Sequence, residues 1–374
     1  MSIRQMFPGS IVKPGFNPLA AQSLLYNLYS WGRNNEGELG LGNLATYSSP
    51  MQVGNLTSWL TVAGGFYHGT SIKSDGTLWS WGRNQYGQLG LGNTTQYESP
   101  KQIGALTNWS KISGGQWFNV AIKTDGTLWT WGENSAGQLG RGNTTNYSSP
   151  VQVGALTNWL YASAGSYHCV AVKTDGTLWT WGAGVAGRLG LGSTTYRSSP
   201  TQVGALTNWA TPSGLYNYTA VIKTDGTLWS WGSNSSGELG LGNTTNYSSP
   251  KQVGALTNWS KAGGGSAFCI NAIKTDGTLW SWGQNNSGQL GLGNTTYYSS
   301  PKQVGGLTTW SQLSTGNRAC AAIKTDGTLW TWGYNQFGQL GLGNTTNYSS
   351  PKQVGASTTW LSVTFNSRFV LAIG

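Results

Sequence analysis

Short hydrophobic runs separated by glycine-rich loops recur along the whole chain. One unit begins with a mixed run at 108–115, continues with apolar runs at 118–124 and 127–132, and ends after a long loop with a fourth run near 150–154. Runs of this length, bounded by Gly, Asn and Asp, indicate β-strands, and no segment shows the sustained 3.6-residue period of an amphipathic helix. The pattern predicts four short antiparallel strands per unit and an all-β fold.

An Asp-Gly pair joins the second and third predicted strands. In this unit it is Asp125-Gly126, within the phrase KTDGTLWTWG. Such a pair between two β runs predicts a two-residue type I′ hairpin, in which both central residues have positive φ. Trp129 and Trp131 stand two positions apart on the next strand, so we expect both rings on one face of the sheet, packed in the core.

The same unit recurs at a fixed period. Phrases close to KTDGTLWTWG begin at Lys73, Lys123, Lys173, Lys223, Lys274 and Lys324. Together with a shortened copy, YNLYSWG, that ends at Gly32, they make seven units of about 50 residues, a period typical of solenoids and propellers. Four short strands repeated radially predict a seven-bladed β-propeller.

The two ends of the chain complement each other. LLYNLYSWG (24–32) supplies a third strand, whereas FVLAIG (369–374) ends where such a strand should follow. We therefore expect the N- and C-terminal strands to share one blade, which closes the ring and removes open sheet edges. The propeller is predicted to span 24–374, and residues 1–23 are predicted to form an extended arm that docks the propeller onto a larger assembly.

The first residues carry no recognisable targeting signal. Pro8, Pro14 and Pro18 interrupt the segment, which lacks the continuous apolar core of a signal peptide. No run reaches the roughly 18 apolar residues that a membrane helix needs. We expect synthesis in a cytoplasm, bacterial or viral in origin, and hypothesise incorporation into a virion.

The charge balance is basic but sparse. The net charge is +10, while only 9% of the residues are charged. A basic chain can bind nucleic acid. Here, however, every aspartate belongs to the repeated turn and follows a lysine by two positions, as Asp125 follows Lys123. This local compensation favours a solvated surface over a nucleic-acid groove.

Candidate catalytic chemistry is scarce. Gly132 and Gly137 have the spacing of a phosphate-binding loop, but Gln138 stands where that loop needs lysine. His68 and His168 share one repeat position, where a structural role is favoured over a metal or base role. No nucleophile–base set, carboxylate pair or metal cluster emerges, so we expect neither enzyme activity nor a cofactor or metal. Three cysteines without a CxxC pair predict buried free thiols: Cys169, Cys269 and Cys320.

The repeats resemble those of the regulator of chromosome condensation (RCC1) family. WGRNQYGQLGLG at 81–92 and WGYNQFGQLGLG at 332–343, each followed by SPxQV and a later AIKTDGTLW, carry the resemblance, which covers about 24–374. It implies a seven-bladed propeller. Similar chains include guanine-nucleotide exchange factors for a small GTPase, a protein inhibitor of β-lactamases, and bacterial and phage proteins with nearly identical repeats. The last group is closest in character, because no inserted wedge or basic tail accompanies the repeats here.

The copies differ mainly on one face of the predicted disc. The turn between the first and second strands and the long loop between the third and fourth share a face, and their residues vary from unit to unit. Aromatic and arginine side chains on divergent loops are typical of interface hot spots, although neutral drift is an alternative. The predicted partner-binding face comprises Arg33, Tyr67, Arg83, Tyr86, Trp117, Phe118, Glu133, Tyr167, Tyr216, Tyr218, Phe268, Arg318, Tyr334 and Phe337.

A second asymmetry lies after the loop proline. Four units carry lysine there, and the other three do not. These lysines predict a basic arc that could steer an acidic partner, or else a solvated rim: Lys101, Lys251, Lys302 and Lys352. Our hypothesis is a non-enzymatic propeller that contacts a protein or glycan, as a phage virion or bacterial surface component. An enzyme inhibitor, an exchange factor for a small GTPase and a lectin are the alternatives.

Overall fold

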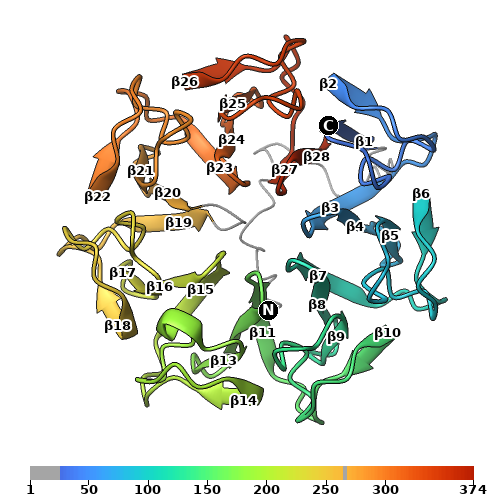
Figure 1. Ribbon diagram of the computed structural model, residues 1–374, viewed down its shortest axis with the longest axis horizontal. Helices are drawn as coiled ribbons and strands as arrows, with labels where there is room; N and C mark the ends of the chain where they lie inside the picture. The colour runs from blue at the N-terminus through green and yellow to red at the C-terminus, as the bar shows by residue number, and fades with distance from the viewer. Residues whose placement is uncertain (1–25, 264–267) are drawn as a thin grey trace, which may run out of the picture.

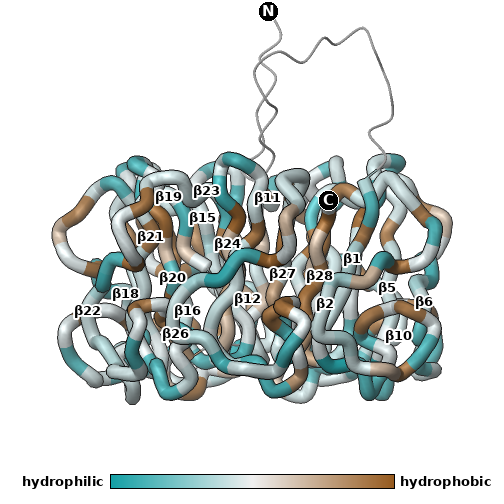
Figure 2. The backbone as a smooth tube through the Cα atoms, turned by 90° about the horizontal axis from the view of Figure 1, so that it is seen from above, coloured by the Kyte–Doolittle hydropathy of each residue, from teal (hydrophilic) through white to brown (hydrophobic). Residues whose placement is uncertain are grey.

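A computed structural model describes residues 26–263 and 268–374 of the chain. Seven four-stranded antiparallel sheets surround a central axis as blades (Figure 1), which confirms the predicted all-β, seven-bladed propeller. Seen from the side, the molecule is a disc whose connections gather on two opposite faces (Figure 2). The predicted arm, residues 1–23, lies outside the described residues.

Six blades are each built from one continuous segment, with the strands running from the axis to the rim in chain order. The inner strands are β3 (Trp59–Gly64), β7 (Trp109–Gly114), β11 (Trp159–Ala164), β15 (Trp209–Gly214), β19 (Trp259–Gly263) and β23 (Trp310–Thr315). The second strands are β4 (His68–Lys73), β8 (Phe118–Lys123), β12 (His168–Lys173), β16 (Tyr218–Lys223), β20 (Cys269–Lys274) and β24 (Ala319–Lys324). The third strands are β5 (Leu78–Gly82), β9 (Leu128–Gly132), β13 (Leu178–Gly182), β17 (Leu228–Gly232), β21 (Leu279–Gly283) and β25 (Leu329–Gly333). The outer strands are β6 (Tyr97–Gln102), β10 (Tyr147–Gln152), β14 (Arg197–Gln202), β18 (Tyr247–Gln252), β22 (Tyr298–Gln303) and β26 (Tyr348–Gln353). One short 3-10 turn, η1 (Val185–Gly187), interrupts a loop.

The seventh blade joins the two ends of the chain, as predicted. Its order from axis to rim is β27 (Ser362–Phe365), β28 (Phe369–Ile373), β1 (Leu28–Gly32) and β2 (Tyr47–Gln52). Strands β1 and β28 pair antiparallel from Leu28 opposite Ile373 to Gly32 opposite Phe369. The indole Nε1 of Trp31 also donates to the Gln339 carbonyl oxygen of the preceding blade at 3.0 Å. Backbone pairing and side-chain packing therefore both close the ring.

The Asp-Gly turn differs from the predicted type I′ hairpin. Gly126 has a positive φ of 77°, but Asp125 does not belong to the left-handed residues. The Asp125 Oδ1 atom accepts hydrogen bonds from the backbone N–H of Thr127 at 2.9 Å and from its hydroxyl at 2.6 Å. The N–H of Gly126 donates to the Lys123 carbonyl, and the N–H of Lys123 donates to the Thr127 carbonyl. The turn is thus a three-residue loop that ends in a left-handed glycine, because the Asp side chain caps its own turn.

Tryptophan rings fill the space between blades. Trp131 is fully buried, and its Nε1 donates to the Gln88 carbonyl oxygen of the preceding blade at 3.0 Å. Trp109 packs edge-on against both Trp129 and Trp131, with ring centroids 6.0 and 6.1 Å apart. The two third-strand rings therefore share one face of the sheet, as predicted. The three cysteines are buried free thiols, also as predicted.

Candidate binding face around the channel mouth

The turns between the inner and second strands surround one mouth of the central channel. In each turn, one tip residue immediately precedes the second strand and is partly exposed. The tip residues are Tyr67, Trp117, Tyr167, Asn217, Phe268, Arg318 and Arg368. The side chains around the mouth therefore differ between blades although the backbone repeats.

Two of the predicted face residues do not reach this surface. Phe118 is 0% exposed and Tyr218 is 1% exposed, because each begins a second strand rather than ending a turn. Successive strand residues point to opposite sides, so the residue after each tip turns into the space between blades. The Tyr218 hydroxyl donates there to the Cys269 carbonyl oxygen at 2.9 Å. Their assignment to a partner-binding face was wrong, and both belong to the core.

His68 and His168 occupy the same buried position. The Nε2 atom of His68 lies 3.2 Å from Asn119 Oδ1, and that of His168 lies 3.0 Å from Thr219 Oγ1, in each case on the next blade. Burial lowers the pKa of His68 to about 4, although its hydrogen bond to Asn119 opposes the shift. Burial also lowers the pKa of His168. Neutral, enclosed imidazoles at the blade interface fit the structural role.

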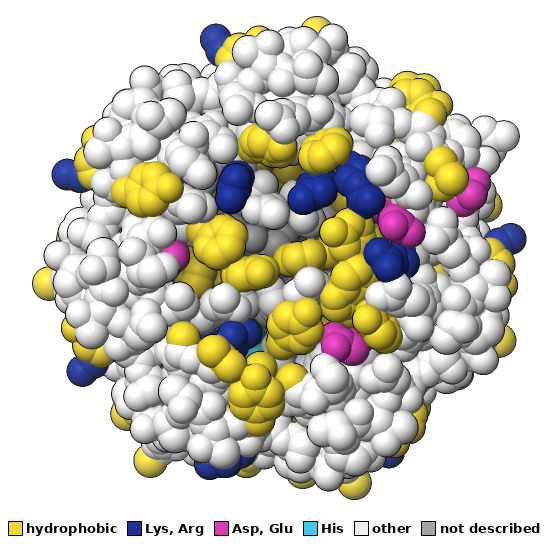
Figure 3. Space-filling view, in the orientation of Figure 1, with side chains coloured by type: hydrophobic (Ala, Val, Ile, Leu, Met, Phe, Trp, Pro, Cys, Tyr) yellow, Lys and Arg dark blue, Asp and Glu magenta, His cyan; other side chains and the backbone are white. Residues whose placement is uncertain are grey.

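An aromatic bridge crosses the channel mouth. Phe66 stacks on Tyr216, from a blade three units away, with ring centroids 6.2 Å apart and planes 7° from parallel. Phe66 also contacts Tyr67 at 6.3 Å, and Tyr216 contacts Phe268 at 4.8 Å. Figure 3 shows this apolar band across the hollowed centre of the face. We define the aromatic bridge as Phe66, Tyr67, Tyr86, Trp117, Tyr216 and Phe268.

Two arginines are held against one end of the aromatic bridge. Tyr67 stacks on Trp117 at 4.9 Å. The Arg33 guanidinium lies 4.8 Å from the Tyr67 ring, and that of Arg83 lies 5.1 Å from the Trp117 ring. Carboxylates fix both cations, since Arg33 pairs with Glu38 at 2.9 Å and Arg83 pairs with Glu36 at 3.4 Å. The two arginine side chains are therefore held in one position, so they lose little conformational entropy when a partner binds.

A second cation pair occupies the neighbouring sector. Arg318 and Arg368 are adjacent tip residues, and neither forms an ion pair within the described part of the chain. Arg318 has a left-handed φ of 65°, an unfavourable conformation for a residue with a side chain. The Arg368 guanidinium lies 5.2 Å from the Phe337 ring, which packs against Tyr334 at 6.3 Å. Arg368 therefore lies against an aromatic ring, as Arg33 and Arg83 do.

Glu133 is less available than its sequence position indicates. It is 9% exposed and accepts hydrogen bonds from the Ser135 hydroxyl at 2.6 Å and from Gln138 Nε2 at 3.1 Å. Burial raises the pKa of its carboxyl. Burial also raises the pKa of Tyr167, and the nearby Glu133 carboxylate raises it further. Glu133 therefore braces its own loop and places negative charge near Tyr167.

Arg188 is a residue of this face that the sequence reading did not single out. It is 4% exposed, and burial lowers the pKa of its guanidinium, a shift that the nearby Tyr196, Tyr216 and Tyr167 oppose. The signal in the sequence is a departure from pattern, because the equivalent position of every other unit holds Gln or Glu.

The predicted basic arc lies elsewhere. All four lysines are exposed on outer strands, whereas the aromatic bridge is built from the inner turns and from Tyr86. Each ammonium lies over the tyrosine of its own strand, as Lys101 does over Tyr97 at 5.5 Å. The arc is thus a feature of the rim, separate from the channel mouth.

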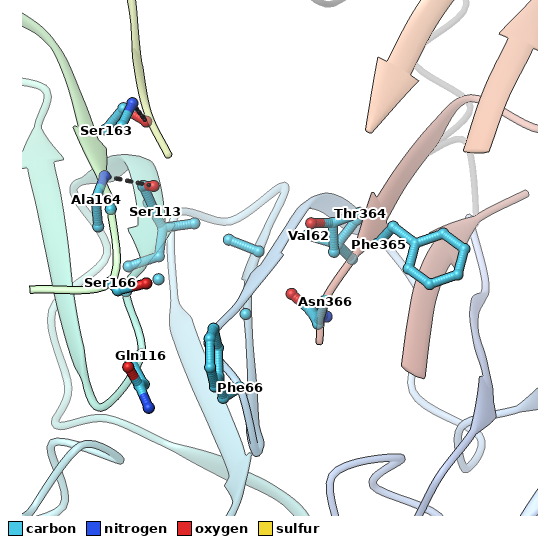
Figure 4. A pocket seen from close by; sticks show the side chains of 18 residues that line it. Val62, Phe66, Ser113, Gln116, Ser163, Ala164, Ser166, Thr364, Phe365 and Asn366 are labelled. Atoms are coloured by element: carbon cyan, nitrogen blue, oxygen red, sulfur yellow. Dashed lines mark hydrogen bonds between the residues drawn. The ribbon is translucent and has the colours of Figure 1, made fainter. Parts of the chain in front are cut away.

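The channel beneath the mouth is enclosed by the inner strands. A cavity of about 230 Å³ is lined by inner strands and turns of several blades, including Phe66, Gln116, Ser166 and Asn366 (Figure 4). Serine side chains join the inner strands of neighbouring blades by hydrogen bonds, as Ser113 Oγ does when it accepts from the Ala164 N–H at 3.1 Å. Within the described residues, no group of three His, Cys, Asp or Glu side chains could hold a metal ion. No helix among them is long and apolar enough to span a membrane.

Solved structures share this architecture. The structure of Prp20p from Saccharomyces cerevisiae, studied with its binding to Gsp1p and histones, is 20% identical and covers 95% of this chain and 92% of its own, with a TM-score of 0.84. Human WBSCR16 is 20% identical and covers 93% of this chain and 98% of its own, with a TM-score of 0.83. Yeast RCC1 (Prp20) bound to Kap60 is 18% identical and covers 100% and 94%, with a TM-score of 0.84. At these identities the similarity establishes the fold.

The family comparison matches a segment in each of the seven units. No curated protein matches the sequence. The model of the regulator of chromosome condensation (RCC1) repeat matches residues 27–72, 75–122, 125–172, 175–213, 225–270, 276–323 and 326–373. A second model of the same repeat matches residues 60–88, 109–138 and 310–339. The chain therefore belongs to the family of regulator of chromosome condensation repeats.

Proposed function

We propose that this protein is a non-enzymatic binding propeller that contacts a protein or glycan through the mouth of its channel. The observation that carries the proposal is the aromatic bridge with its adjoining arginines. It stands where the backbone repeats but the side chains do not. Half-buried aromatic rings and oriented guanidiniums are the groups that dominate interface energetics, and a rigid ring of blades limits the entropy lost on binding.

The proposal is tested with variants that remove the rings without disturbing the blades. Because Trp117, Tyr216 and Phe337 are partly exposed, their combined replacement by Ala should abolish binding while leaving the folded ring intact. Leu206→Ala is the matched control, since Leu206 is 49% exposed in a connection on the opposite face. Glycan arrays and affinity capture with identification by mass spectrometry distinguish the two partner classes. Equal binding by the triple variant and the control would contradict the proposal.

The biological setting is part of the proposal. The nearly identical repeats resemble those of phage and bacterial proteins, which supports a virion decoration, receptor-contacting or bacterial surface component. In this setting residues 1–23 act as the anchoring arm. Deleting residues 1–22 should leave a folded propeller, as judged by circular dichroism, that no longer joins its assembly. Loss of folding on deletion, or unchanged assembly, would count against the arm.

An exchange factor for a small GTPase is the second candidate. It is supported by the fold shared with Prp20p, a protein studied for its binding to Gsp1p. Release of a fluorescent guanine nucleotide from a panel of small GTPases tests it. Acceleration of release that Trp117→Ala abolishes would favour this candidate over a passive scaffold.

A further inference from the structure

One loop position braces the long loop in six of the seven blades. There a Gln or Glu side-chain oxygen accepts a hydrogen bond from the backbone N–H two residues earlier, as Gln138 does from Ala136 at 2.9 Å. The other five distances lie between 2.7 and 2.9 Å. The bracing residues are Glu38, Gln88, Gln138, Glu238, Gln289 and Gln339. A hydrogen-bond acceptor is therefore the structural requirement of this position.

Arg188 breaks the pattern, because a guanidinium has no acceptor atom. Its Nε instead donates to the Val185 carbonyl oxygen at 3.1 Å, and the loop tightens into η1, with Ala186 at a left-handed φ of 57°. Glycine also replaces the asparagine that supports the loop in the other units, at Gly184. In the preceding blade that asparagine, Asn134, accepts from the Leu139 N–H at 2.9 Å. This loop therefore lacks both the Gln or Glu acceptor and the Asn acceptor of the other blades, and it contains a buried cation instead.

The positive charge of Arg188 has no counter-charge in the described part of the chain. The three ion pairs recorded there all involve Arg33 or Arg83. Arg188 is 4% exposed, and its Nη1 atom finds no hydrogen-bond partner. Burial lowers the pKa of the guanidinium, yet arginine remains protonated at neutral pH. Burying an unpaired charge is strongly unfavourable, and such a group is stabilised when an anion reaches it.

We propose that Arg188 is the binding site for a carboxylate of the partner, either an Asp or Glu side chain or a chain terminus. This inference rests on the proposed binding function of the face and names one chemical feature of the partner. The Nε–H is occupied by Val185, which leaves the terminal Nη groups, whose coplanar N–H donors match the two oxygens of a carboxylate. Tyr216 and Tyr167, which oppose the lowering of the Arg188 pKa, belong to the turns of the same mouth.

A carboxylate fits this surrounding better than a phosphate. The groups coupled to Arg188 are Tyr196, Tyr216, Tyr167 and His168, and burial keeps the His168 imidazole neutral, so no second cation accompanies the guanidinium. The Glu133 carboxylate also raises the pKa of Tyr167, so negative charge is already present near that tyrosine. A single guanidinium can neutralise a monoanion, but it leaves a phosphate dianion undercompensated.

Nuclear magnetic resonance of the arginine Nε–H groups in the full chain tests the site without any partner. Sodium acetate is titrated against sodium chloride at constant ionic strength, and the Arg188 signal is assigned by its loss in Arg188→Gln. We expect a saturable shift of that signal with acetate and none with chloride. An acetylated, amidated glutamate should produce the same shift, and its glutamine counterpart should not.

Matched variants separate a binding role from a structural one. Arg188→Gln restores the residue that four other blades carry, so it is expected to fold, and acetate should no longer raise its melting temperature. Arg197→Gln removes the same charge from outer strand β14 of the same blade and should keep the wild-type acetate response. Arg188→Lys retains the positive charge without the planar guanidinium donors, so acetate should raise its melting temperature less than that of the wild type.

Three outcomes would overturn the assignment: an unchanged Arg188 signal in acetate, an equal melting response in Arg188→Gln, or tighter binding of inorganic phosphate than of acetate. Because the probe is a small carboxylate, a negative result here leaves the binding function of the aromatic bridge standing. Conversely, a failure to find any protein or glycan partner leaves the carboxylate site intact.

Discussion

The two faces of the disc are built from the same seven repeats but use their side chains differently. The face opposite the channel mouth carries the turns between the second and third strands, such as KTDGT at 123–127, and we call it the KTDGT face. Six blades repeat one set of hydrogen bonds there: Asp accepts from the Thr hydroxyl, and the Thr hydroxyl accepts from the indole N–H of Trp, as Asp125, Thr127 and Trp129 show at 2.6 and 2.8 Å. On the channel-mouth face, interior hydrogen bonds also repeat, but the outward residues range from Asn217 to Trp117. Side chains that satisfy the backbone internally are thus constant, and they leave the outward positions free to diverge.

The largest effect is expected inside the shared scaffold. Trp131→Ala removes a fully buried ring and its 3.0 Å hydrogen bond to the preceding blade, which should cost about 3–5 kcal/mol of unfolding free energy. Trp117→Ala removes a partly exposed ring at the channel mouth and should cost less than about 1.5 kcal/mol. Urea denaturation measures both. Equal losses would mean that the mouth is as structural as the core and would erase the contrast.

Two glycines on the KTDGT face allow a second comparison of stability. Gly126 and Gly154 both have positive φ, 77° and 61°. A Cβ at Gly126 would lie 2.0 Å from the Thr157 carbonyl oxygen, whereas one at Gly154 would meet nothing within 4 Å. Gly154→Ala should therefore cost only the left-handed conformation, about 1 kcal/mol, and Gly126→Ala about 2–3 kcal/mol in total. Thermal unfolding of both variants compares them, and similar costs would argue against tight contact at the turn.

The loop brace supplies a pH-dependent comparison between neighbouring blades. Burial raises the pKa of Glu238, whereas the next blade has Gln289 at the same position. A raised folded-state pKa gives stability that is fully present below the unfolded value, about 4.3, and is lost as the pH rises through the folded value. Glu238→Gln should therefore stabilise the protein at neutral pH, with the gain vanishing near pH 4.

Chemical denaturation across this pH range measures the effect of Glu238→Gln. Gln289→Glu is the reciprocal control, and it should introduce the opposite pH dependence. A gain for Glu238→Gln that persists unchanged at acid pH would show that packing, rather than ionisation, distinguishes the two blades.

The sequence was sufficient for the architecture, because a fixed period reveals the number of blades and complementary ends reveal the closure. It was not sufficient for details set by one residue of register. Trp117 and Phe118 are both aromatic, and only the start of strand β8 decides which one faces solvent. Contacts across the propeller axis could not be predicted either. Phe66 and Tyr216 belong to blades three units apart, and they come together only because the blades close into a ring. Likewise Asp125 forms a turn other than type I′, because its carboxylate bonds to Thr127 rather than adopting positive φ.

The smallest effect on stability is expected at the rim, where the four lysines of the basic arc are exposed. Lys101 is exposed, and its ammonium lies 5.5 Å from the Tyr97 ring, so Lys101→Ala should change the unfolding free energy by less than about 0.5 kcal/mol. If the arc steers an acidic partner, replacing all four lysines by Ala should slow association at low salt and leave dissociation unchanged, because exposed charges act mainly on encounter. Surface plasmon resonance at two ionic strengths measures both rates. An unchanged association rate would assign the lysines to solvation of the rim and confine recognition to the channel mouth, whereas faster dissociation would place them inside the interface.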